Sequence, residues 1–154
     1  MLVAGLSFNQ KNIFMKNRNL NHSDNWATPK DLFDKLNAEF NFDFDPCPLN
    51  SDFDGLKLDW GKSNFINPPY SDKKESGNLK SSFVKKAIEE SKKGKTCVML
   101  LPVSTSTKLF HDHILPNAKE IRFLKGRVKF MGTNTKGEQV TNKCGMHDSM
   151  VVVF

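Results

Sequence analysis

Four consecutive residues, Asn67-Pro68-Pro69-Tyr70, combine groups that suit chemistry on an aromatic amine. Such an amine is a poor nucleophile, because its lone pair is delocalised into the ring. It reacts more readily when acceptors take up its two hydrogens, and the Asn67 side-chain oxygen and the Pro68 carbonyl oxygen are suitable acceptors. The prolines stiffen the turn, and Tyr70 offers a flat face on which an extruded base can stack. A rigid turn with a buried tyrosine is the alternative that needs no catalysis.

The elements upstream of this tetrapeptide must bring other residues to it. A short apolar run, Ser63–Ile66, predicts a strand that ends where the turn begins, and the polar–aromatic alternation of residues 41–45 predicts another strand, stopped by two prolines. Thr28 and Pro29 predict the start of a helix, with Thr28 as the N-cap and Pro29 at the first helical position. An apolar stripe follows at helical spacing: Leu32, Phe33, Leu36 and Phe40.

Beyond the tetrapeptide, predicted helices and strands alternate. Residues 96–103 form a near-continuous apolar run, which is typical of a central strand covered on both faces. The other predicted elements are helices over 81–93 and 106–115, strands over 120–124, 127–131 and 150–154, and a loop over 132–147. This order predicts an α/β layered domain with a mostly parallel sheet and a C-terminal antiparallel hairpin. Open α/β sheets bind ligands at the carboxyl ends of their strands, which is where the tetrapeptide stands.

Length and composition describe one globular domain. The 154 residues divide into an Asn-rich segment over 1–25, which we expect to be a flexible arm, and a single domain over 26–154. No apolar run approaches the roughly 20 residues of a membrane helix, and the first residues lack the basic start of a signal peptide. The three cysteines are widely spaced and odd in number, so we expect a reducing cytoplasm and no metal site. Cys47 has no evident histidine partner and is interpreted as a buried thiol in a pocket wall.

The net charge of +6 is distributed unevenly. Residues 1–60 carry six basic and nine acidic side chains, whereas residues 61–154 carry 17 basic and eight acidic ones. A basic C-terminal part suits a polyanion such as nucleic acid, although a solvated lysine-rich surface explains the count equally well. The candidate DNA contacts are Lys73 and Lys74 after the tetrapeptide, and Lys125, Arg127 and Lys129. The last three alternate along a predicted strand and would share one face, as a phosphate-contacting or a merely solvated edge would.

Several short motifs in one order resemble the phage-type DNA N6-adenine methyltransferases. The tetrapeptide looks like the catalytic motif of the amino-group DNA methyltransferases. The other motifs, in chain order, are Trp26-Ala27-Thr28-Pro29, Asp43-Phe44-Asp45-Pro46-Cys47, Asp54-Gly55-Leu56, Trp60 and Arg127-Val128-Lys129-Phe130. Because the resemblance extends over residues 24–154 and joins several motifs, it is much more specific than the tetrapeptide alone.

The resemblance implies an activity and assigns roles to residues. It implies that the protein transfers a methyl group from S-adenosylmethionine to the N6 amino group of adenine in DNA, after the base flips into the Asn67-Pro68-Pro69-Tyr70 pocket. Thr28 and Pro29 are similar to the segment whose backbone approaches the methionine end of the cofactor. Asp45 and Pro46 stand where the family's first cofactor motif ends its strand, and Asp54 resembles an acidic residue near the nucleoside portion.

The sequence departs from the larger adenine methyltransferases around the cofactor. The residues after Asp45 contain no glycine-rich loop, and only 22 positions separate Asp45 from Asn67. A βαβ unit needs about 30 residues. We therefore expect either a trimmed sheet or a cofactor pocket built from loops.

These observations predict a Rossmann-like methyltransferase sheet, either trimmed or with a pocket built from loops, and an adenine-specific DNA methyltransferase. The expected cofactor is S-adenosylmethionine, the expected partner is DNA, and the expected location is the cytoplasm of a bacterial or phage-infected cell. Three alternatives stay open: methylation of adenine in RNA, methylation of a glutamine amide in a protein, and a catalytically inactive nucleic-acid-binding module. The last is motivated by the missing glycine-rich loop.

Overall fold

The computed structural model describes residues 26–49, 51–69, 72–73, 77–133 and 138–154. Its elements are, in chain order, α1 (Lys30–Phe40), β1 (Ser63–Ile66), β2 (Asp72–Lys73), β3 (Gly77–Asn78), α2 (Leu79–Lys92), β4 (Thr96–Pro102), the π-helix η2 (Leu109–Ile114), α3 (Leu115–Asn117), β5 (Glu120–Phe123), β6 (Lys129–Thr133), β7 (Gln139–Cys144) and β8 (Ser149–Val153). None of these helices is long and apolar enough to cross a membrane. The predicted N-terminal arm lies outside the described residues.

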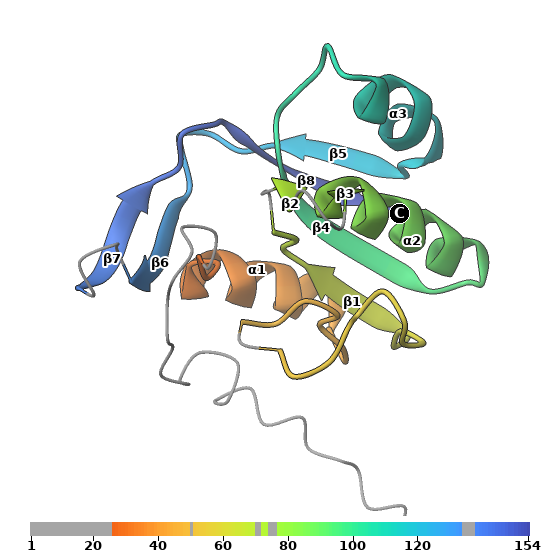
Figure 1. Ribbon diagram of the computed structural model, residues 1–154, viewed down its shortest axis with the longest axis horizontal. Helices are drawn as coiled ribbons and strands as arrows, with labels where there is room; N and C mark the ends of the chain where they lie inside the picture. The colour runs from red at the N-terminus through yellow and green to blue at the C-terminus, as the bar shows by residue number, and fades with distance from the viewer. Residues whose placement is uncertain (1–25, 50, 70–71, 74–76, 134–137) are drawn as a thin grey trace, which may run out of the picture.

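A four-stranded sheet in the order β1-β4-β8-β5 forms the centre of the domain (Figure 1). β1 and β4 run parallel, whereas β8 runs antiparallel to both β4 and β5. The fold is therefore mixed α/β, and the prediction of a mostly parallel sheet is confirmed only in part: β1, β4 and β5 run in one direction, and β8 runs against them. The reason is that no crossover helix separates β5 from β8, so the chain returns in the opposite direction.

β6 and β7 form a separate antiparallel ribbon that projects from the domain (Figure 1). The predicted C-terminal hairpin therefore exists, but outside the central sheet. The prediction of a continuous loop over residues 132–147 is wrong, because β6 extends to Thr133 and β7 pairs with it. An antiparallel bridge between Met131 and Ala27 continues this pairing on the other side of β6. The Gly and Asn residues have low strand propensity and predict a loop, but pairing with neighbouring strands outweighs that propensity.

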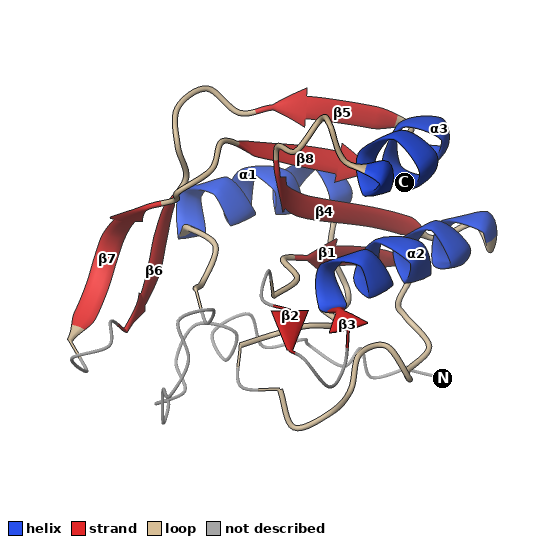
Figure 2. Cartoon of the chain, turned by 45° about the horizontal axis from the view of Figure 1, so that its top comes forward, coloured by secondary structure: helices blue, strands red, loops and turns tan. Residues whose placement is uncertain are grey.

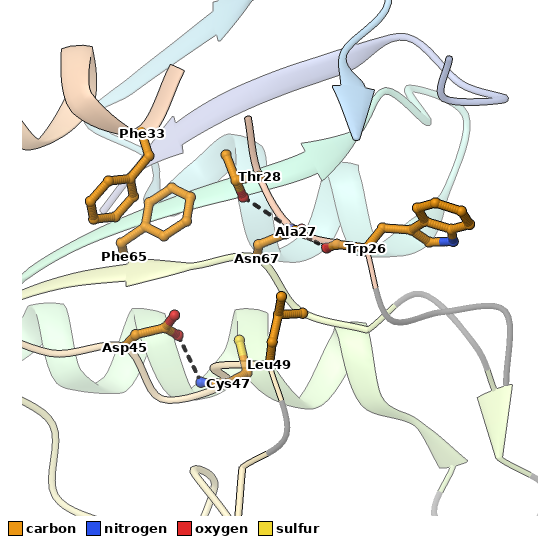
Figure 3. A pocket seen from close by; sticks show the side chains of 9 residues that line it. All are labelled: Trp26, Ala27, Thr28, Phe33, Asp45, Cys47, Leu49, Phe65 and Asn67. Atoms are coloured by element: carbon orange, nitrogen blue, oxygen red, sulfur yellow. Dashed lines mark hydrogen bonds between the residues drawn. The ribbon is translucent and has the colours of Figure 1, made fainter. Parts of the chain in front are cut away.

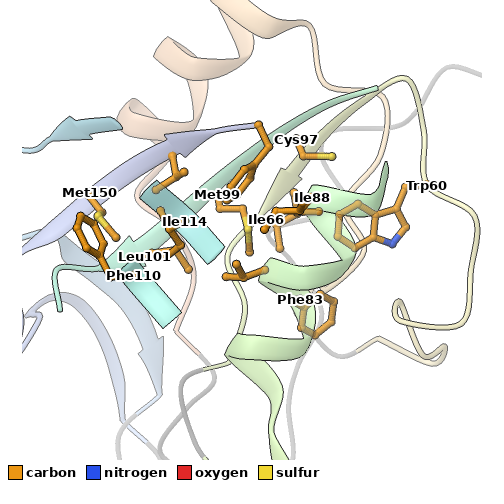
Figure 4. Packing of buried hydrophobic residues seen from close by; sticks show 14 residues of the cluster. Trp60, Ile66, Phe83, Ile88, Cys97, Met99, Leu101, Phe110, Ile114 and Met150 are labelled. Atoms are coloured by element: carbon orange, nitrogen blue, oxygen red, sulfur yellow. The ribbon is translucent and has the colours of Figure 1, made fainter. Parts of the chain in front are cut away.

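Helices cover both faces of the central sheet (Figure 2). β4 alternates between them: Val98 and Leu100 pack in the cluster that contains α1, while Met99 and Leu101 pack in the cluster with α2 and η2 (Figure 4). All four side chains are essentially inaccessible to solvent. The predictions of a central strand covered on both faces and of a helix near 81–93 are confirmed. The predicted helix over 106–115 is also present, as the π-helix η2 and the short α3.

The start of α1 differs from the prediction. The helix begins at Lys30, Pro29 occupies the N-cap position in an extended conformation, and no side chain caps the helix. Thr28 is therefore not the N-cap. Its buried hydroxyl instead accepts a hydrogen bond from the Asn67 side chain. A tertiary partner has replaced the local one that the sequence pattern predicts, because capping and tertiary bonding compete for the same oxygen.

Irregular chain over residues 46–49 and 51–62 stands in place of the helix of a standard βαβ unit. Phe44 forms a parallel bridge with Asn64, so residues 41–45 contribute one bridge to the edge of the sheet and not the predicted strand. The loop is folded back on itself: the Trp60 indole donates to the Gly55 carbonyl at 2.8 Å. A Cβ at Gly55 would lie 1.7 Å from the Pro46 carbonyl oxygen, so only glycine fits there. The parallel edge of the sheet is thus built without a crossover helix.

A buried carboxylate fastens the end of α2 to the chain before β4. Glu90 is 1% exposed and accepts hydrogen bonds from Lys93, at 2.8 Å, and from Lys95. Lys95 also donates to Asp59 and to the Trp60 carbonyl. Burial acts to raise the pKa of Glu90, but its lysine partners outweigh burial and hold the pKa at about 2.

This network predicts a loss of stability in acid. Because the folded-state pKa lies below the ordinary value, ionised Glu90 stabilises the fold above pH 4.5, and the contribution is lost as the pH falls from 4.5 towards 2. Its upper limit is about 3 kcal/mol. We expect Glu90→Gln to lower the free energy of unfolding by about 2 kcal/mol at pH 7, with the difference from wild type narrowing towards pH 2. Urea unfolding at several pH values measures this, with the exposed Glu89→Gln as the control. Equal stability of both variants at pH 7 would contradict the prediction.

Candidate active site

Asp45 and Asn67 lie at the same edge of the sheet, the one formed by the carboxyl ends of its parallel strands. The segment that ends at Asp45 runs parallel to β1 through the Phe44–Asn64 bridge, and Asn67 directly follows β1. Since neighbouring parallel segments end at one edge, residues 22 positions apart come together there. The segment around Thr28 closes the crevice from the other side (Figure 3).

The Asn67 side chain has a fixed orientation. Its amide nitrogen donates to the Thr28 hydroxyl at 3.1 Å and to the Trp26 carbonyl oxygen at 3.3 Å (Figure 3). A backbone carbonyl can only accept, so the group that faces Trp26 must be the NH₂ end of the amide. Because the carboxamide is planar, fixing its nitrogen also fixes the direction of its oxygen. The oxygen is thus aimed before any ligand arrives.

The two prolines after Asn67 continue the chain away from β1. Pro68 is buried and Pro69 is partly buried. Their rings restrict φ, which limits the freedom of the turn that carries the Pro68 carbonyl. Tyr70, the fourth residue of the tetrapeptide, lies outside the described residues.

The Asp45 carboxyl group lies in a poorly solvated environment. Burial raises its pKa to about 7, against the opposing effect of the Cys47 backbone N–H, which donates to the carboxylate at 2.9 Å. Asp45 therefore changes charge near neutral pH. Burial and the neighbouring Asp45 raise the pKa of the Cys47 thiol well above its usual value, so the thiol is a poor nucleophile. Cys47 lines the crevice, which confirms its interpretation as a wall residue.

The crevice between these segments encloses about 30 Å³, room for little more than a water-sized or methyl-sized group. Its lining residues are Trp26, Ala27, Thr28, Phe33, Asp45, Cys47, Leu49, Phe65 and Asn67 (Figure 3). Sequence reasoning assigned no site role to Phe33, Leu49 or Phe65. For Phe65 a signal existed, since residues two apart on a strand share a face and Phe65 stands two before Asn67.

Three other predicted cofactor residues lie in different places. Pro46 is buried directly after Asp45, beneath Gly55. Asp54 is exposed, accepts from the Leu56 N–H at 3.0 Å and forms an ion pair with Lys57 at 3.5 Å. It is not among the residues that line the crevice. Pro29 lines a second, open groove between the start of α1 and β6.

The predicted basic residues gather at this second groove. Lys125, Arg127 and Lys129 are exposed and line it together with Lys30. They do not alternate along one strand, as predicted, because Gly126 adopts a φ of +75° and β6 begins only at Lys129. Arg127 also forms a 3.6 Å ion pair with Asp148. Lys73 belongs to β2, and Lys74 lies outside the described residues.

Fold and site together define a mixed α/β protein with a crevice at the carboxyl ends of adjacent parallel segments, lined by a carboxyl group, an oriented carboxamide and aromatic rings. The chain belongs to the DNA N-6-adenine-methyltransferase (Dam) family, whose model matches residues 16–154. A relative named DNA N-6-adenine-methyltransferase, from Haemophilus phage HP1 (strain HP1c1), is 35% identical over 146 residues, covering 85% of this chain and 78% of the relative. No solved structure matches the chain significantly. Family membership confirms the resemblance and the predicted class of enzyme, an adenine-specific DNA methyltransferase.

Proposed function

We propose that the protein transfers the methyl group of S-adenosylmethionine to the N6 nitrogen of an adenine flipped out of DNA. The observation that carries the proposal is that Asp45 and Asn67, distant in sequence, line one crevice at the carboxyl edge of the sheet. The arrangement supports a trimmed, Rossmann-like methyltransferase fold in which loops replace one helix. DNA is the macromolecular partner, as the family name indicates.

Asn67 and Pro68 bind the adenine amino group in this proposal. The Asn67 side-chain oxygen and the Pro68 carbonyl oxygen accept its two hydrogens and favour a tetrahedral nitrogen as the methyl group arrives. The rigid turn and the bonds to Thr28 and Trp26 limit the reorganisation that this requires. Tyr70 stacks on the flipped base. No general base is needed if the proton leaves to solvent after transfer.

The crevice suits the cationic end of S-adenosylmethionine. The cofactor supplies an electrophilic methyl group on a positively charged sulfur. Asp45, poorly solvated when ionised, gains a cation as its partner. Phe33 and Phe65 present aromatic rings beside it, which also favour cations. The small enclosed volume fits the reacting end and not the whole cofactor, so we assign the remaining contacts to the Thr28-Pro29 segment, Pro46 and, near the nucleoside, Asp54.

The groove between α1 and β6 is the proposed path of the DNA backbone. Lys125, Arg127 and Lys129 place three cations along it. In the sequence, Lys73 and Lys74 add positive charge shortly after the tetrapeptide. Contacts of this kind fix the position of a duplex without reading its sequence. They also make binding weaken as salt concentration rises.

Replacing Thr28 with valine tests the orientation of the Asn67 amide. The valine keeps the shape of the side chain and removes the hydroxyl that accepts from Asn67, while the bond to the Trp26 carbonyl remains. We expect kcat for methyl transfer to fall about tenfold, in line with the loss of one hydrogen bond. Thr28→Ser should recover most of the rate because it restores the acceptor. If Thr28→Ser were as slow as Thr28→Val, the hydroxyl would not be what orients Asn67.

The substrate is tested by offering methyl-labelled S-adenosylmethionine with unmethylated DNA, RNA or a mixture of proteins. We expect label in DNA. Preferential label in RNA or on protein glutamine would replace the proposed substrate. Failure to bind S-adenosylmethionine by calorimetry would instead favour an inactive nucleic-acid-binding module.

A further inference from the structure

The turn over residues 145–148 joins β7 to β8 at the edge of the sheet that carries the crevice. Val103, the residue after β4, donates its N–H to the Asp148 carbonyl at 2.8 Å. Because β1 and β4 are parallel, Val103 and Asn67 both follow carboxyl ends of strands. β8 lies two strands from β1, a separation of about 10 Å. A duplex bound across this edge can therefore meet the turn and the crevice together.

The backbone of this turn is anchored at both ends. The Gly145 N–H donates to the Val128 carbonyl at 3.0 Å, and a Cβ at Gly145 would lie 3.2 Å from the Phe130 ring. Asp148 is fixed by its bond from Val103 and by its ion pair with Arg127. Met146 and His147, which lie between these anchors, therefore extend from a backbone that is held in place.

Met146 projects from the turn into solvent. It is 81% exposed, the most exposed large apolar side chain in the described part of the chain. A single exposed methionine is ordinary on a protein surface. This one lies beside two cations that line the second groove: Arg127 pairs with Asp148, two positions after Met146, and Lys129 is paired in register with Cys144, two positions before it. Neighbouring cations suit a nucleic-acid contact better than the core of a protein interface, which is depleted of charged side chains.

Extrusion of a base leaves a gap in the stack and costs a few kcal/mol of stacking and pairing. Unbranched apolar side chains such as methionine can enter between bases and offset that cost. We propose that Met146 enters the duplex and occupies the space left by the flipped adenine, while Arg127 and Lys129 hold the adjacent phosphates. The inference rests on the proposed function and adds the element that drives base extrusion.

The test replaces Met146 with alanine and measures extrusion directly. Once wild-type protein has identified a methylated site, 2-aminopurine at that position reports flipping by its fluorescence. We expect Met146→Ala to reduce the fluorescence rise at least fivefold and kcat/KM at least tenfold, with the Kd for S-adenosylmethionine unchanged. Met146→Leu should keep most of the activity because it restores an apolar wedge. Phe123→Ala, at an exposed apolar position on β5, is the matched control and should resemble wild type.

A second duplex separates a wedge from a purely structural role. When the target adenine faces an abasic position, pairing is absent and extrusion is easier, so the deficit of Met146→Ala should shrink to within threefold of wild type. A deficit that is equally large on this duplex would overturn the inference, as would normal flipping by Met146→Ala on the intact duplex. Absence of methyl transfer by the wild type would instead refute the proposed function on which the inference rests.

Discussion

Asn67→Ala is expected to lower kcat for methyl transfer about 100- to 1,000-fold while leaving the Kd for S-adenosylmethionine within about threefold. The magnitude is that of removing one preorganised polar group that acts where charge changes in the transition state. The bonds from Asn67 to the Thr28 hydroxyl and the Trp26 carbonyl aim its amide before the substrate enters, and alanine has no side-chain acceptor to take its place. A single-turnover rate with saturating cofactor measures the chemical step without product release.

Two further variants sharpen the test of Asn67. Asn67→Asp keeps an acceptor for the adenine hydrogens but places a second acceptor against the Trp26 carbonyl, so an intermediate rate is expected. Asn117→Ala removes an asparagine that donates to the His113 carbonyl at 2.8 Å, away from the crevice, and should keep the wild-type rate. A full rate for Asn67→Ala would remove Asn67 from the chemistry.

Asp45→Asn is expected to weaken binding of S-adenosylmethionine about 10- to 100-fold at pH 8, the usual cost of losing a charge-assisted contact. Burial raises the pKa of Asp45 to about 7, so the carboxyl group is largely protonated at pH 6 and largely ionised at pH 8. The cationic sulfonium pairs only with the ionised form. The wild-type Kd should therefore fall as the pH rises from 6 to 8, and the Kd of Asp45→Asn should change much less.

As the pH rises from 6 to 8, the free energy of unfolding of the ligand-free protein should fall, whereas its affinity for the cofactor should rise. A folded-state pKa above the ordinary value of 3.8 means that Asp45 favours the fold in its protonated form. That contribution is complete below about pH 4 and is lost as the pH rises through 7. Asp45→Asn should therefore be at least as stable as wild type at pH 8 while it binds the cofactor worse. Asp112→Asn, at an exposed position on η2, is the matched control and should alter neither property. A less stable Asp45→Asn variant with unchanged affinity would assign Asp45 a structural role.

The meeting of Asp45 and Asn67 was predictable from the sequence because it follows from strand ends alone. Each residue closes a short strand-like segment, and parallel segments end at one edge. The small number of residues between them also predicted a trimmed sheet or a pocket built from loops, and the described residues between Asp45 and β1 form no helix. The sequence pattern and the fold agree at this point because only local signals and one general rule of sheets are involved.

Other features depend on tertiary partners that no local pattern encodes. Thr28 looks like an N-cap, but its hydroxyl serves Asn67, 39 positions away. In the sequence, Phe33 is part of an ordinary amphipathic stripe, and only the packing of α1 on the sheet brings its ring against Phe65. The positive φ of Gly126 interrupts the predicted strand. Lys125, Arg127 and Lys129 therefore line a groove and do not alternate along one strand. β8 runs antiparallel because of how the chain returns, which periodicity does not reveal.

The central claim is the position that receives the methyl group, and nucleoside mass spectrometry tests it most directly. Unmethylated DNA is incubated with the protein and trideuteromethyl S-adenosylmethionine, digested to nucleosides and analysed. We expect the deuterated methyl group in N6-methyldeoxyadenosine. Deuterated methyl on cytosine, or no labelled nucleoside from protein shown to bind the cofactor, would contradict the claim.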